Sequence, residues 1–205
     1  MRLWKRAPFT LCLMAFLSLA AEFALQLVPD AGMLASKIVP PLLTCGMFIG
    51  AHAIESGGRA RIGDVFVPFA ASAGAIGAIV LSSLVIFAAE ALAVYIIADA
   101  NLLRVANPDM SLASVLAMFA VGVLVSLPFT FLPMCALIDH MGFAQSFAAS
   151  FRAFSLNMPA FLLYGVLSYV LLLVGIATLG VGLVIVLPLW ATSSYVAWRE
   201  VMHAG

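Results

Sequence analysis

The chain has 205 residues, of which 65% are hydrophobic and 9% are charged, and nine basic side chains balance nine acidic ones. Soluble domains carry about 25% charged residues, so this composition excludes an ordinary water-soluble fold. The zero net charge, with no basic arm and no acidic tail, also argues against a nucleic-acid partner.

The hydrophobic residues fall in long blocks, which are typical of helices that cross a membrane. Inside lipid, every backbone N–H and C=O must be bonded within the protein, and a helix does this within one segment. The blocks are too long for barrel strands of about ten residues. We therefore predict an all-α fold, a polytopic membrane helical bundle that forms one domain over residues 1–205 and has the lipid bilayer as a partner.

Six transmembrane helices account for these blocks. The first begins after a basic segment and resembles a signal peptide, but its apolar run continues beyond the small residues near Ala20, so we expect it to be retained. The block 65–98 is too long for one upright helix, and we divide it into a short segment and a span. In chain order, the predicted spans cover residues 8–28, 34–54, 73–98, 111–138, 158–177 and 182–201.

Two further segments, 64–71 and 142–155, are predicted to be interfacial helices. In the second segment, phenylalanine recurs at spacings of four, four and three residues, which places the rings on one helical face. This stripe consists of Phe143, Phe147, Phe151 and Phe154. We interpret it as a surface anchor, and contact with a partner helix is the alternative.

Prolines interrupt two of the predicted spans. Pro40 and Pro41 lie in the second span, and Pro128 and Pro133 lie in the fourth, so we expect both helices to be kinked or broken. Transporters use the backbone carbonyls of broken helices to hold ions or substrates, although membrane helices also tolerate proline without such a role.

Lysine and arginine determine the predicted orientation, because cytoplasmic loops are enriched in them. With six spans, one side of the membrane collects seven basic residues and the other side collects two, Lys37 and Arg104. The seven are Arg2, Lys5, Arg6, Arg59, Arg61, Arg152 and Arg199. We therefore predict a multi-pass protein of the bacterial inner membrane with both termini in the cytoplasm.

Glu22 and Glu90 are the acidic residues that lie well inside predicted spans. A charged side chain at the bilayer centre costs about 2.5–3.5 kcal/mol, so such residues often have a function. Both lie roughly 9–12 Å from the outer ends of their helices. One interpretation is a protonatable pair that lines a cavity, and the other is two residues that are protonated or solvated near the surface. Lys37 is the one basic residue near that depth.

His52 and His140 complete the candidate intramembrane polar site. Each follows a proline by 12 residues at the inner end of a predicted span, which suggests a faint internal repeat. A metal or proton site between these helices is one interpretation. Two solvated histidines are the other, because no set of cysteine or carboxylate ligands surrounds them. His203, in the C-terminal tail, is predicted to be solvated.

Recognisable catalytic chemistry is absent from the sequence. It contains no phosphate-binding glycine loop, no HExxH motif and no plausible serine–histidine–aspartate set. Cys12, Cys45 and Cys135 are far apart, and we interpret them as small buried hydrophobic residues. We therefore predict no catalytic residue, no metal site, no cofactor and no enzymatic activity.

Several parts of the chain resemble one family. The first is Trp4-Lys5-Arg6-Ala7-Pro8, and the last runs from Tyr195 to Val201. The longest part runs from Asp139-His140 to Gly165 and includes Ala144, Ser146-Phe147, Asn157, Ala160-Phe161-Leu162 and Tyr164. In these residues the chain resembles an uncharacterised family of small bacterial inner-membrane proteins with six helices. The resemblance implies a fold and a location but no activity, and Glu22 and Glu90 lie outside it.

Three classes of function are compatible with the sequence, and a membrane enzyme is the least favoured of them. The scarcity of polar residues favours an accessory or scaffold membrane protein, whose partner is another membrane protein or a second copy of the chain. The broken helices, the faint repeat and the two intramembrane glutamates favour the alternative, a transporter for a small solute or a lipid.

Overall fold

The computed structural model describes residues 2–28, 31–98 and 111–203, and every regular element in these ranges is a helix. Residues 29–30 and the connection 99–110, which contains Arg104, lie outside the described residues. The elements are α1 (Arg2–Arg6), α2 (Pro8–Gln26), α3 (Ala31–Ser36), α4 (Val39–Glu55), η1 (Ile62–Ala70), α5 (Ala73–Ala98), α6 (Leu112–Ser126), η2 (Leu127–Phe129), α7 (Leu132–Leu137), α8 (Phe143–Leu156), α9 (Met158–Ala177) and α10 (Leu183–His203).

Four helical stretches are long and apolar enough to cross a membrane. They are Pro8–Gln26, Ala73–Ile97, Leu112–Leu137 and Met158–Ala177. The all-helical class is therefore confirmed, and by length and composition these four helices are compatible with four of the predicted spans. The other two predicted spans correspond to α4, which has 17 residues and a length of about 26 Å, and to α10, which contains Pro188. Their passage through the membrane stays a prediction.

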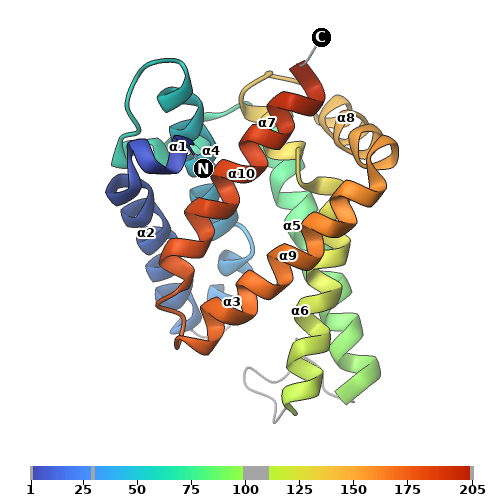
Figure 1. Cartoon of the computed structure of the whole chain (residues 1–205). Coiled ribbons are helices and arrows are strands. Elements are labelled where there is room, and N and C mark those ends of the chain that lie inside the picture. The colour runs from blue at the N-terminus through green and yellow to red at the C-terminus, as the bar shows by residue number, and fades with distance from the viewer. Residues whose placement is uncertain (1, 29–30, 99–110, 204–205) are drawn as a thin grey trace.

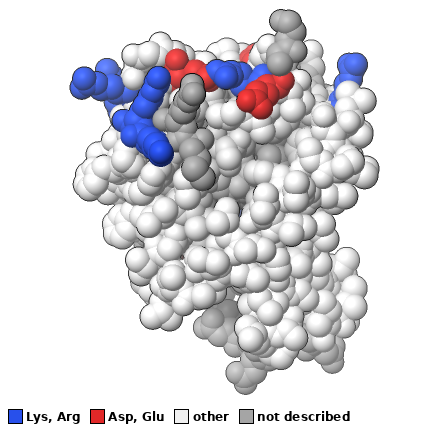
Figure 2. All heavy atoms as spheres, viewed as in Figure 1, with Lys and Arg blue, Asp and Glu red and all other residues white. Residues whose placement is uncertain are grey.

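The helices run between two ends of the molecule (Figure 1). α2 leads away from the end where both termini lie, and α4 returns to it. α5 leads away again, α6 and α7 return, α9 leads away, and α10 brings the chain back. On the face seen in Figure 2, the coloured charged side chains gather at that same end, and the other described residues on this face are uncharged.

The break in the second predicted span differs from the expectation. α3 ends at Ser36 and α4 begins at Val39, so the interruption lies at Lys37 and Ile38, before the two prolines. Pro40 and Pro41 lie in the first turn of α4. Proline is favoured there because its missing N–H would have no partner inside the helix and its φ is already helical. The prolines therefore start the second piece rather than interrupt a continuous span.

The break in the fourth predicted span is confirmed. α6 passes into the short 3₁₀ helix η2 at Pro128, and α7 starts beside Pro133. The hydroxyl of Ser150, on α8, donates a hydrogen bond of 2.6 Å to the carbonyl of Pro128. This bond satisfies a backbone acceptor at the broken segment, so α8 holds the break in place.

A helix at each predicted interfacial segment is confirmed, as η1 and α8, whereas their position in a membrane interface stays a prediction. The phenylalanine stripe of α8 is only partly covered, since Phe143 is 42% and Phe151 48% exposed. The buried face of α8 instead consists of the small residues Ser146, Ser150 and Ala153. Small side chains let α8 approach η2 and α7 closely, and the larger rings lie beside this contact.

Candidate functional site

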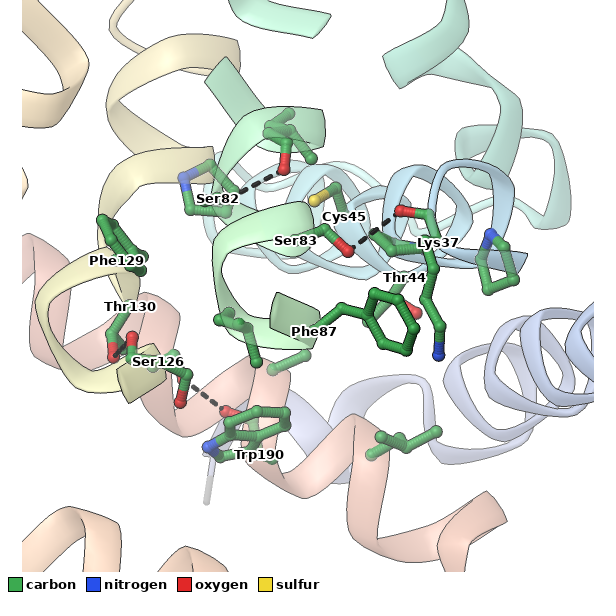
Figure 3. A pocket seen from close by; sticks show the side chains of 18 of the residues that line it. Lys37, Thr44, Cys45, Ser82, Ser83, Phe87, Ser126, Phe129, Thr130 and Trp190 are labelled. Carbon is green, nitrogen blue, oxygen red and sulfur yellow. Dashed lines mark hydrogen bonds between the residues drawn. The ribbon is translucent and has the colours of Figure 1, made fainter. Parts of the chain in front are cut away.

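A cavity of about 370 Å³ lies among α2, the start of α4, α5, the broken segment between α6 and α7, and α10 (Figure 3). Its wall is mostly apolar and aromatic, with Phe48, Phe87, Phe129 and Trp190 among its residues. The cavity therefore lies where both broken spans meet three other helices.

Three ionisable side chains from distant parts of the sequence line this cavity: Glu22 on α2, Lys37 between α3 and α4, and Glu90 on α5. The charges of Lys37 and Glu22 both act on the Glu90 carboxyl. The ion pairs found in the described part of the chain involve other residues, so neither glutamate is directly paired with Lys37. The structure thus brings together the two predicted glutamates and the one basic residue expected near their depth.

Lys37 is held by an aromatic ring rather than by a carboxylate. Its ammonium nitrogen lies 4.7 Å from the centre of the Phe87 ring, and Figure 3 shows the two side chains next to each other. The backbone carbonyl of Lys37 accepts a hydrogen bond of 2.9 Å from the Ser83 hydroxyl. α5 therefore fixes both the backbone and the side chain of the link between α3 and α4.

The Glu90 carboxyl has its place because α6 carries a glycine opposite it. A Cβ atom built on Gly122 would collide with Oε1 of Glu90 and would lie 2.9 Å from its Cδ. Gly122 is itself buried. The absence of a side chain at this position thus lets the carboxylate pack directly against the α6 backbone.

The hydroxyl groups around the cavity mostly donate to nearby carbonyls. Ser82 donates to Ile79 at 2.8 Å, and Ser126 donates to Val123 at 2.7 Å. Thr130 donates more weakly, at 3.4 Å, to the carbonyl of Ser126. These donors are already used, whereas the lone pairs of their oxygens can still accept hydrogen bonds.

A second polar cluster lies at the charged end of the molecule, around a pocket of about 450 Å³. Nδ1 of His52, on α4, lies 3.0 Å from the hydroxyl of Tyr195, on α10. Glu55 and Arg199 form an ion pair between the same two helices. The cluster therefore ties α4 and α10 together at the charged end of the molecule.

The third contact of this cluster involves a residue that was predicted to be solvated. Nε2 of His203 lies 3.3 Å from Oδ1 of Asp139, which follows α7. The side chain of His203 is 46% exposed, so it is partly solvated, as predicted. In addition, it has a specific partner, which the sequence analysis did not predict. The two residues are far apart in sequence, and no local pattern indicates that they meet.

The proposed pairing of His52 with His140 finds no counterpart in the structure. His140 is exposed, has a φ of 53°, and is not among the residues around the pocket that contains His52. Asp139, its neighbour, lines that pocket instead, because the chain turns sharply after α7. The four predicted polar residues therefore divide into a glutamate pair in the cavity, His52 in the second polar cluster, and His140 on the surface.

α4 connects the two sites along one face. Thr44 and Phe48 line the cavity, and His52 and Glu55 line the pocket of the second polar cluster, at spacings of four, four and three residues. Residues with this spacing share one side of a helix. The second polar cluster thus lies on the same α4 face as the cavity, toward the charged end.

Within residues 2–28, 31–98 and 111–203, no group of three or more His, Cys, Asp and Glu side chains is arranged to hold a metal ion. The cysteines are free thiols, of which Cys45 and Cys135 are buried as predicted and Cys12 is partly exposed. No family model, curated protein or solved structure matches the chain. The family resemblance therefore stays a prediction, and an interpretation of function depends on the cavity.

Proposed function

We propose that this protein binds a small solute in the intramembrane cavity and carries it across the bacterial inner membrane. The observation that carries this proposal is the convergence of Glu22, Lys37 and Glu90 on one cavity inside an apolar helical bundle. Ionisable side chains within a membrane are expensive to insert and typically mark substrate or ion pathways.

The proposed topology has six spans, with α4 and α10 as the second and sixth, and η1 and α8 in the cytoplasmic interface. Both termini are then cytoplasmic. The excess of lysine and arginine on one predicted side supports this arrangement, as does the collection of charged side chains at the end where the chain begins and finishes (Figure 2).

The sequence on its own favours an accessory or scaffold protein, and we propose the transporter instead for a physical reason. Each intramembrane charge costs about 2.5–3.5 kcal/mol on insertion scales. A scaffold gains nothing from placing three such groups around an internal cavity, whereas a solute site uses them directly. Binding of another membrane protein, or of a second copy of the chain, stays a prediction.

The broken helices support the same proposal. Pro40, Pro41 and Pro133 all line the cavity, next to the breaks between α3 and α4 and between α6 and α7. Transporters commonly place discontinuous helices at their binding sites, and short links of this kind are positions where helical pieces can move relative to each other. The cavity is therefore next to segments that can open it.

A thermal-melting screen of the purified protein in mild detergent tests this function. The solutes should include amines, carboxylates, zwitterions and sugars. At about 100 times its Kd, a cavity ligand adds roughly 2.7 kcal/mol of stability, which corresponds to a Tm rise of about 5–10 °C for a chain of this length. We expect at least one solute to give this rise, and we expect the E22Q/E90Q double variant to lose it.

The matched control is Glu200→Gln, which removes an exposed carboxylate near the end of α10, away from the cavity. It should keep the full Tm rise. The proposal is contradicted if no solute of any charge changes the Tm of the wild-type protein. A stable partner that then co-purified with the chain would favour the accessory role.

A further inference from the structure

The cavity has a preference for one kind of charge, and we propose that its ligand is a monovalent organic cation with an apolar body. This inference depends on the proposed function, because it names the substrate class of the same site. Three features of the cavity support this ligand: its balance of charges, its balance of hydrogen-bond donors and acceptors, and its aromatic surfaces.

The charges favour a cation. Two carboxylates and one ammonium line the cavity, and among the described residues Glu90 has neither an ion-pair partner nor a hydrogen-bond donor. Glu22 accepts a hydrogen bond of 3.1 Å from the side chain of Gln26. Lys37 can balance only one of the carboxylates. A cationic ligand can pair with the second carboxylate, and a charge in an apolar environment is more stable paired than unpaired.

The hydrogen-bonding groups favour the same ligand. The hydroxyls of Ser82, Ser83 and Ser126 donate to backbone carbonyls, so they offer acceptors to the cavity. The indole N–H of Trp190 is buried and has no partner in the described part of the chain, and it can serve a single acceptor. An anion or a sugar would need several donors, and the cavity has few besides Lys37.

Lys37 itself demonstrates how the cavity receives an ammonium group. Its ammonium nitrogen lies over the face of Phe87, and Lys37 forms none of the ion pairs found in the described part of the chain. Phe48, Phe129 and Trp190 provide other aromatic surfaces around the same space. Aromatic faces attract alkylammonium groups strongly when water is excluded. A second ammonium group, carried by the ligand, can thus be bound in the same manner.

The volume distinguishes an organic cation from a metal ion. A space of about 370 Å³ is within the usual range of roughly 300–1,000 Å³ for small-molecule sites. A bare metal ion would leave most of it empty, and a divalent ion needs a closer set of oxygen ligands than two separated carboxylates. The apolar walls suit the hydrocarbon part of the ligand.

The test is isothermal titration calorimetry of the full chain in mild detergent with two probes of similar shape, benzylammonium and phenylmethanesulfonate. The wild-type protein should bind the cation and not the anion. Glu90→Gln should raise the Kd of the cation about tenfold or more, since it removes a charge-assisted contact. Lys37→Met should lower that Kd several-fold, because the competing ammonium is then gone.

The comparison of the two probes on the wild-type protein needs no variant, so it holds even if Glu90→Gln fails to fold. Stronger binding of the anion, or a weaker cation affinity in Lys37→Met, would overturn the inference. If neither probe binds but another solute raises the Tm in the melting screen, the organic-cation inference fails while the proposed function stands. If no solute has any effect, the proposed function itself fails.

Discussion

Substitution of Gly122 by alanine is expected to weaken solute binding by about tenfold or more while the protein still folds. The new methyl group would occupy the place of the Glu90 carboxylate, which must then rotate away from α6. A charge-assisted contact is worth about 1.5–3 kcal/mol, and its loss corresponds to roughly a 10–100-fold change in Kd. Calorimetric titration with benzylammonium measures this change.

The matched control for this variant is Gly77→Ala on α5. A Cβ atom at Gly77 would lie 3.7 Å from the ring of Phe143, which is an ordinary contact. Gly77 is not part of the cavity wall. Both variants gain helix propensity equally. Unchanged binding by Gly122→Ala would show that the position of the Glu90 carboxylate does not matter for the solute.

Substitution of Gly46 by alanine is expected to destabilise the protein by about 2–3 kcal/mol. Gly46 is buried where α4 packs on η1, and an added Cβ atom would collide with Cα of Val65 and lie 2.6 Å from the carbonyl oxygen of Asp64. Backbone atoms cannot rotate away as a side chain does, so the two elements must separate. The expected decrease in Tm is roughly 5–10 °C in detergent.

Gly63→Ala is the control for this second variant. Gly63 lies in η1, and an added Cβ atom would meet nothing within 4 Å. Its Tm should stay close to that of the wild-type protein. A Gly46→Ala variant as stable as Gly63→Ala would mean that α4 and η1 do not pack as closely as described.

Much of the fold is predictable because the preference of apolar blocks for lipid can be read directly from the sequence. Blocks of apolar residues define helices in lipid whatever their neighbours are. The division of 65–98 into η1 and α5 and the break around Pro128 and Pro133 follow from helix length and from the missing proline N–H. The position of the second break is predicted less well, since a proline at the start of a helix and one in its interior look alike in sequence.

The glutamates of the candidate site are also predictable, because an ionisable residue within an apolar block is conspicuous in the sequence. Their common cavity is not, because it depends on how α2 and α5 pack against the broken helices. Gly122 gives no signal of its own, since its role comes only from the Glu90 carboxyl on another helix. The contact between His203 and Asp139 is equally hidden, as it joins segments that meet only in the folded chain.

Thiol labelling in native membranes measures directly whether the cavity is open to water and ligand. Cys12, Cys45 and Cys135 are first replaced by alanine, and one cysteine is then introduced in each variant. Thr44→Cys places the thiol in the cavity wall, and Val85→Cys places it on the exposed apolar face of α5. Maleimides react with the thiolate, which forms in water and not in lipid.

We expect Thr44→Cys to react much faster than Val85→Cys and to be protected by benzylammonium. That result would identify a hydrated cavity inside the membrane that a solute can fill. Equal and slow labelling at the two positions, without protection by the cation, would contradict the account, because the space around Glu22, Lys37 and Glu90 would then be closed to both water and ligand.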